Sequence, residues 1–68
     1  MLHVNETSKD EWDRYVCTHG EALSLIKWLL AKHYWFDVYY SGAEYHVKCN
    51  LLPREIPKKL KLKVEEAK

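Results

Sequence analysis

The chain has 68 residues, of which 47% are hydrophobic and 31% are charged, and its formal net charge is +1. This length allows a single small domain, 1–68, with a thin core, and this balance of residue types excludes a disordered chain. A net charge so close to zero excludes a strong general attraction to nucleic acid or to an anionic membrane.

The first six residues, 1–6, alternate between apolar Leu2 and Val4 and their polar neighbours. Alternation of this kind is typical of a β-strand. We therefore predict a short edge strand at this end of the chain.

The segment 8–19 carries signals for a helix and for a strand. Ser8 and Glu11 match a capping box, in which a hydroxyl and a carboxylate satisfy the free N–H groups of a first helical turn. Apolar and aromatic side chains follow at helical spacing, at Trp12, Tyr15, Val16 and His19. We predict a helix over 8–19 that ends at Gly20. The alternative is a strand from Trp12 to Cys17, because these residue types also favour extended backbone.

Residues 21–33 have the most regular helical pattern. Glu21 lies at the expected N-terminal end, while Lys32 and His33 lie at the C-terminal end, so their charges complement the helix dipole. A broad apolar stripe runs between them, at Ala22, Leu25, Ile26, Leu29 and Leu30. The pattern predicts a helix over 21–33 that packs on a sheet.

Two strand-like runs, 35–40 and 44–51, flank a turn signal at Ser41-Gly42 and predict a β-hairpin. Alternation separates the two faces of this hairpin. The expected inner face carries Phe36, Val38 and Tyr40 against Tyr45, Val47, Cys49 and Leu51. The expected outer face carries Trp35, Asp37 and Tyr39 against Glu44, His46 and Lys48.

Two prolines, Pro53 and Pro57, bracket a loop after the hairpin, because proline interrupts both strands and helices. Over 59–64, apolar residues alternate with lysines, which predicts a half-buried strand with a solvated lysine face. We expect the last four residues, 65–68, to form a frayed tail.

Together these elements predict an α+β fold: a small single domain with one or two helices packed on a three-stranded antiparallel sheet, or on a four-stranded one if 1–6 adds a strand. The order of the strands does not follow from the sequence. The expected core contains Leu25, Ile26, Leu29, Leu30, Phe36, Val38, Tyr45, Val47, Cys49, Leu51, Leu60 and Leu62.

The chain has two cysteines, Cys17 and Cys49. A metal site built from them with His19 and His46 is disfavoured, because His46 and Cys49 would point to opposite faces of one strand. We therefore expect no metal and no cofactor. The longest apolar run is interrupted by polar residues, so we expect no membrane span. Without a leader sequence or a disulfide framework, the expected location is cytoplasmic, with reduced thiols.

The sequence contains no phosphate-binding loop, nucleophile elbow or dinucleotide fingerprint, so we do not expect an enzyme. The order helix, strand, strand, strand over 21–64 resembles that of small RNA-binding and toxin-nuclease domains. In the toxin nucleases a Gly-rich turn precedes a catalytic His, as Ser41-Gly42 precedes His46 here. Their compact Gly-Ser/Thr-His motif is absent, so this resemblance is one of topology and implies no family.

Nine aromatic rings are more than so small a core can bury, and exposed Trp and Tyr often form contact sites. We therefore predict a small non-enzymatic regulator or inhibitor that binds a larger protein, with homodimerisation as a further expectation. The candidate binding residues are Trp35, Tyr39, His46, Lys48 and Arg54. The alternative is an RNA- or DNA-binding module that uses the same face with Arg54 and the lysines of 58–63. An RNase-like enzyme centred on His46 comes third.

Overall fold

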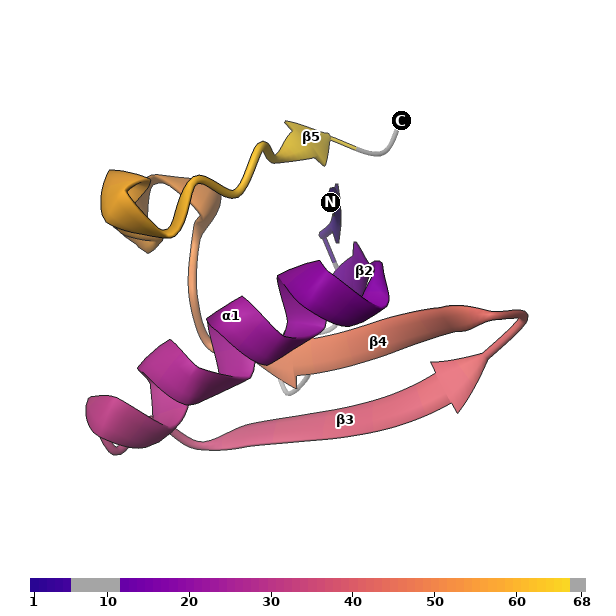
Figure 1. The fold of residues 1–68 in the computed structure, drawn as a ribbon, viewed down its shortest axis with the longest axis horizontal. Helices are drawn as coiled ribbons and strands as arrows, with labels where there is room; N and C mark the ends of the chain where they lie inside the picture. The colour runs from indigo at the N-terminus through magenta and orange to yellow at the C-terminus, as the bar shows by residue number, and fades with distance from the viewer. Residues whose placement is uncertain (6–11, 67–68) are drawn as a thin grey trace.

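In the computed structural model, which describes residues 1–5 and 12–66, one α-helix packs on a five-stranded mixed sheet (Figure 1). The strands are β1 (Leu2–Val4), β2 (Asp13–Cys17), β3 (Phe36–Ser41), β4 (Glu44–Cys49) and β5 (Glu65–Glu66). Their order in the sheet is β3-β4-β2-β1-β5, and only the β1–β5 pair is parallel. The fold is α+β, as predicted, with more strands than the predicted three or four. β1 is an inner strand, whereas we predicted an edge strand.

The prediction of a helix over 8–19 is wrong for the part of that segment that the structure describes. Residues 8–11 lie outside the described residues, and 13–17 form β2, as in the alternative interpretation. Tyr15 and Cys17 alternate inward and are buried, while β2 pairs with β1 on one side and β4 on the other. Pairing on both sides satisfies the backbone groups of the strand, and this outweighs the helical spacing of its side chains.

The helix, α1 (His19–Ala31), begins two residues before the predicted start, and Gly20 lies in its first turn. The Thr18 side chain accepts from the Glu21 N–H, and the Glu21 carboxylate accepts from the Thr18 N–H at 2.8 Å. This is the same capping-box pattern that we assigned to Ser8 and Glu11. The helix ends before the predicted His33, which has a φ of 60° and terminates it.

The predicted hairpin and its register are confirmed. Phe36, Val38 and Tyr40 pair with Cys49, Val47 and Tyr45, so these six residues share one face of the sheet. Gly42 and Ala43 have φ values of 58° and 66°, the pair of positive angles that defines a type I′ turn. This turn joins β3 to β4 with two residues, and its twist matches that of the strands.

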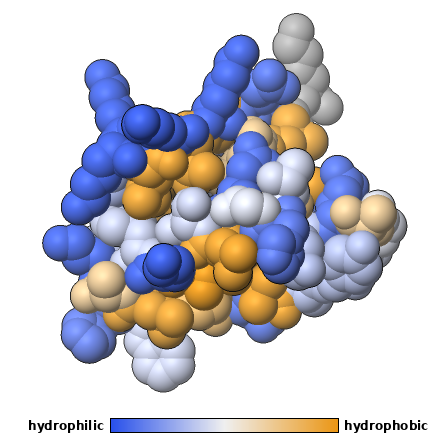
Figure 2. Space-filling view, in the orientation of Figure 1, coloured by the Kyte–Doolittle hydropathy of each residue, from blue (hydrophilic) through white to orange (hydrophobic). Residues whose placement is uncertain are grey.

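The predicted strand at 59–64 is wrong. Instead, two 3₁₀-helices, η1 (Pro53–Glu55) and η2 (Lys58–Leu60), precede an extended stretch that reaches β5. Lys61 has a φ of 56°, which turns the backbone out of any continuous strand. Glu65 and Glu66, which we placed in a frayed tail, pair with β1, and residues 67–68 lie outside the described part. Long hydrophilic side chains project above this segment in Figure 2.

The core lies between the sheet and α1. Its buried members are Tyr15, Cys17, Ala22, Leu25, Leu29, Val47, Cys49, Leu51 and Ile56. Of the predicted core residues, Leu30 and Val38 are exposed. Leu30 lies outside the stripe of α1 that Ala22, Leu25 and Leu29 bury, and α1 contacts β2 and β4, which leaves Val38 of β3 uncovered. Within residues 1–5 and 12–66, no helix has the length and the apolar content needed to cross a membrane.

Candidate functional site

The strands divide their side chains between two faces of the sheet, because directly paired residues point to the same side. The inner face, covered by α1 and the C-terminal segment, carries the buried core residues (Figure 1). The outer face carries the alternate residues: Leu2, Val4, Arg14, Val16, Asp37, Tyr39, Glu44, His46 and Lys48. Three of the five predicted site residues, Tyr39, His46 and Lys48, lie on this face.

Tyr39 and His46 form a stacked pair at the middle of the hairpin. Their ring centroids are 4.8 Å apart and the rings are within 4° of parallel. Arg14 of β2 contacts the same imidazole, with its Nη1 3.0 Å from Nδ1 of His46. Because a guanidinium can only donate, Nδ1 accepts this hydrogen bond and a neutral ring keeps its proton on Nε2. One face of the His46 ring and its Nδ1 are therefore in contact with other side chains, and the Nδ1 lone pair is not available for His46 to act as a general base.

Lys48 lies two residues along β4 from His46, in the next row of paired side chains on the outer face. It is directly opposite Asp37 of β3 on one side and Arg14 of β2 on the other. Two cationic side chains therefore occupy the central strands of the outer face, and an acidic one lies on the outermost strand. Glu44 adds a second carboxylate at the hairpin end of the face. Charge on this surface is mixed, with its positive part at the centre.

Trp35 is 82% exposed and comes directly before β3. The register of the sheet, continued by one residue, places Trp35 and Trp12 on either side of Asn50. These three residues line a hollow of about 180 Å³ together with Tyr34 and Leu51. Trp35 therefore belongs to an aromatic rim at one end of the outer face, and Trp12 is a member that the sequence analysis did not include.

Arg54, the fifth predicted site residue, does not join the others. It lies in η1 and lines a separate hollow with Ile56, Pro57 and Lys58, among other residues. Ile56 is buried in the core beside α1, so this segment packs on the inner side of the sheet. The lysines of 58–63 belong to the same C-terminal segment. The structure therefore does not join Arg54 and these lysines to the outer face, as the nucleic-acid alternative expected.

A buried polar cluster on the inner side was missed by the sequence analysis. His3 is 4% exposed, and its Nε2 and Nδ1 lie 2.9 Å and 2.6 Å from the carboxylates of Asp13 and Glu66. Burial lowers the pKa of His3, but the hydrogen bonds to the two carboxylates outweigh that effect and leave it raised above 6.5. No local signal marks this cluster, because its members come from β1, β2 and β5.

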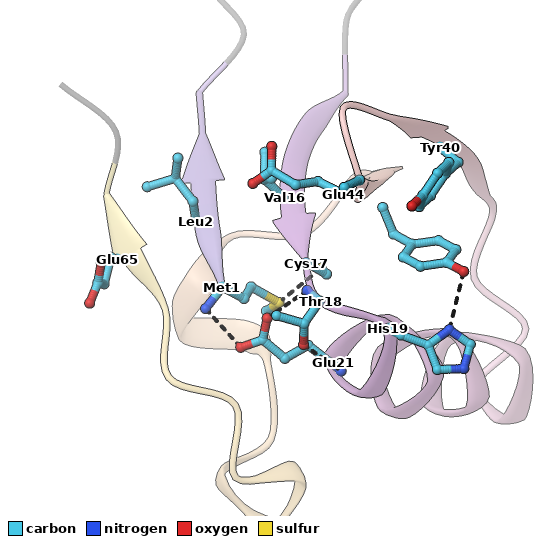
Figure 3. Close-up of a pocket in the computed structure, with 12 residues that line it drawn as sticks. Met1, Leu2, Val16, Cys17, Thr18, His19, Glu21, Tyr40, Glu44 and Glu65 are labelled. Carbon is cyan, nitrogen blue, oxygen red and sulfur yellow. Dashed lines mark hydrogen bonds and ion pairs between the residues drawn. The ribbon is translucent and has the colours of Figure 1, made fainter.

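A hollow of about 480 Å³ lies where the start of β1 and the end of β2 meet the start of α1 (Figure 3). Glu21 accepts from the Met1 α-amino group there at 2.9 Å, and His19 contacts the Tyr45 hydroxyl at 3.1 Å. Cys17 lines this hollow, and burial raises the pKa of its thiol to about 11. The thiol is therefore protonated at neutral pH and is a poor nucleophile.

The structure places Cys49 on the inner face and His46 on the outer face, as the alternation predicted. Within the described residues, no three His, Cys, Asp or Glu side chains converge as ligands for a metal ion. Both cysteines are free thiols.

Comparisons of the chain with protein families, with curated proteins and with solved structures give no match. The outer face and its charges are therefore the basis for the functional proposal.

Proposed function

We propose that this protein is a small non-enzymatic regulator or inhibitor that docks the outer face of its sheet on a larger protein. The observation that carries the proposal is the contact of Tyr39 and Arg14 with His46 on a face that α1 does not cover. Side chains that are already ordered lose little conformational entropy on binding. Tyr and Arg are also among the residues that dominate the energetics of protein interfaces.

The charges of the outer face indicate the chemistry of the partner. Arg14 and Lys48 lie on the central strands, and Asp37 and Glu44 lie toward the rim. Val16 supplies an apolar contact next to His46. This arrangement fits a protein surface with carboxylates at its centre and apolar and basic groups around them. The two unpaired thiols support a cytoplasmic location for such a partner.

Single-stranded nucleic acid is the second candidate, favoured by the spacing of aromatic groups. Tyr39 and Trp35 are four residues apart along the chain, or about 13 Å in an extended strand. The row of Lys48 and Arg14 lies between these two aromatic positions. Rings that stack bases on either side of cations that contact phosphates would suit a short single strand. The carboxylates of Asp37 and Glu44 oppose this interpretation.

An RNase-like activity centred on His46 has the least support. Arg14 occupies the Nδ1 lone pair of His46, and catalysis by a general base needs an accessible one.

Site-specific photo-crosslinking in extracts of the native cell tests the proposal. A photoreactive phenylalanine at Tyr39 should give an adduct of one defined mass with a protein larger than this chain, while the same group at Leu30, exposed on α1, should give none. Adducts of the same mass from both positions would contradict docking through the outer face. An adduct with nucleic acid, released by salt with a steep dependence, would favour the second candidate instead.

A further inference from the structure

The edge strand β3 is the most exposed part of the sheet. It ends the strand order, and in Figure 1 it runs along the border of the molecule with no element beyond it. Val38 is 38% exposed and Tyr40 is 62% exposed, although both point to the inner face. An exposed edge with apolar side chains and no proline or lysine is open to pairing with another strand.

The type I′ turn determines which backbone groups of β3 are available for pairing. Such a turn closes with a hydrogen bond between Ser41 and Glu44, so the hydrogen-bonded pairs with β4 recur at Tyr39 and Asp37. The N–H and C=O groups of the alternate residues, Phe36, Val38 and Tyr40, therefore point away from the sheet. The Val38 N–H donates to Oδ1 of its neighbour Asp37 at 3.0 Å, in agreement with this alternation.

We propose that β3 pairs antiparallel with β3 of a second copy of this chain, with Val38 opposite Val38 of that copy. This pairing joins the two five-stranded sheets into one continuous sheet. It places both α1 helices on the same side of the joined sheet, because the side chains of Phe36, Val38 and Tyr40 point to the inner face in both copies. The inference goes beyond the proposed function, since it concerns the edge of the sheet and a second copy of this chain.

Three properties of β3 select this register. Phe36, Val38 and Tyr40, whose backbone groups point away from the sheet, all meet residues of the same kind in the second copy. This allows about six main-chain hydrogen bonds. On the inner face, Phe36 of each copy packs against Tyr40 of the other, and the exposed Val38 side chains meet at the two-fold axis. The pairing replaces the hydrogen bond from Val38 to the Asp37 carboxylate with a main-chain bond.

Charge on the outer face also fits this register. Asp37 of one copy lies opposite Tyr39 of the other, whose ring stacks on the His46 that Arg14 contacts. The acidic side chain therefore lies opposite a phenol and not opposite another carboxylate. Moving the centre of the pairing by one residue toward the N-terminus would set Asp37 against Asp37, and like charges directly opposite each other are unfavourable.

Disulfide trapping tests both the pairing and its register. Val38→Cys should form a covalent dimer under mild oxidation, because directly opposite residues have Cα atoms at disulfide distance. Tyr39→Cys should not form a covalent dimer, because residue 39 lies diagonal to, and not directly opposite, residue 39 of the other copy. Wild type provides the background from Cys17 and Cys49, which are buried. Sedimentation equilibrium should show a reversible dimer for wild type and a monomer for Val38→Asp. Circular dichroism should show that Val38→Asp is folded.

A wild-type chain that remains monomeric up to about 1 mM would overturn the proposal. A dimer that Tyr39→Cys traps and Val38→Cys does not would overturn it too, because its register would differ. If Val38→Asp fails to fold, the trapping comparison decides the question alone. Loss of the dimer leaves the crosslink at Tyr39 to the larger protein as a separate readout of the proposed function.

Discussion

Glu66 lies 2.6 Å from Nδ1 of His3, a contact between residues 63 positions apart in the chain. The other ring nitrogen of His3 contacts Asp13. An ionised carboxylate can only accept, so these two contacts favour the charged imidazole, in which both ring nitrogens donate. This one side chain holds β5 and β2 to β1, although β5 contributes only two residues to the sheet.

The first prediction concerns the dependence of stability on pH. The pKa of His3 is raised in the folded protein relative to 6.5 in the unfolded chain. The stabilisation is therefore fully present below pH 6.5 and is lost as the pH rises through the folded-state pKa. Urea unfolding should show a lower free energy of unfolding at alkaline pH than at pH 6.5, and His3→Gln should remove most of that decrease.

His33→Asn is the matched control for the His3 experiment. His33 is exposed, and Asn tolerates its positive φ. This variant should keep the pH dependence of the wild type. An unchanged pH dependence in His3→Gln would show that the cluster of His3, Asp13 and Glu66 does not contribute to stability.

The second prediction uses Gly20, which lies in the first turn of α1, where a Cβ added to the backbone would meet nothing within 4 Å. Gly20→Ala should raise the free energy of unfolding by about 0.4–1 kcal/mol, because alanine reduces the entropy of the unfolded chain. Gly42→Ala should have the opposite effect, since Gly42 has a φ of 58° in the type I′ turn. Thermal denaturation of the two variants measures both changes in the free energy of unfolding. Destabilisation by Gly20→Ala would instead favour the C-cap that we predicted from the sequence.

The third prediction concerns the stacked pair on the outer face. Tyr39→Ala should lower the free energy of unfolding by about 0.5–1.5 kcal/mol, because it removes the ring that packs on His46. Tyr39→Phe should retain most of that energy. Trp35→Ala, at an 82% exposed position, is the control and should change stability little. Equal losses for Tyr39→Ala and Tyr39→Phe would show that the hydroxyl, and not the stacked ring, is responsible.

The fourth prediction concerns the two thiols. Burial raises the pKa of Cys17 to about 11 and that of Cys49 to about 12. At about pH 8 roughly one Cys17 thiol in a thousand is ionised, so neither cysteine should react readily with iodoacetamide. Intact-mass spectrometry should find no adduct on the folded protein and two adducts in urea. Rapid modification of the folded protein at either cysteine would contradict the burial of the inner face.

Local patterns were sufficient to predict the hairpin of β3 and β4. Alternation and a Gly-containing turn specify the register of adjacent strands, because a slip by one residue would reverse every side chain. The same alternation separated Cys49 from His46 and placed Tyr39 and Lys48 together. For this reason the sequence assigned four candidate site residues to one face: Trp35, Tyr39, His46 and Lys48. The structure has the last three within the strands of that face, and Trp35 directly before β3.

The segment of β2 and the residues after Pro57 show where local patterns fail. Trp12, Tyr15 and Val16 satisfy helical spacing and strand propensity equally well, and only pairing with β1 and β4 decides between them. The lysine alternation of 59–64 has no strand beside it to pair with in the described part of the chain. Arg54 was grouped with the hairpin because of its charge, yet it lines a separate hollow with residues of the C-terminal segment, whose Ile56 is buried in the core.

The sequence by itself determined the α+β class, the hairpin with its two faces, and the presence of a helix near 21–33. These features depend on contacts between residues close in the chain, whose geometry follows from the periods of helices and strands. Only the tertiary structure decided the strand order, the position of Arg54 and the cluster of His3, Asp13 and Glu66. These depend on contacts between distant segments, where burial and hydrogen bonding in the whole molecule outweigh local preference.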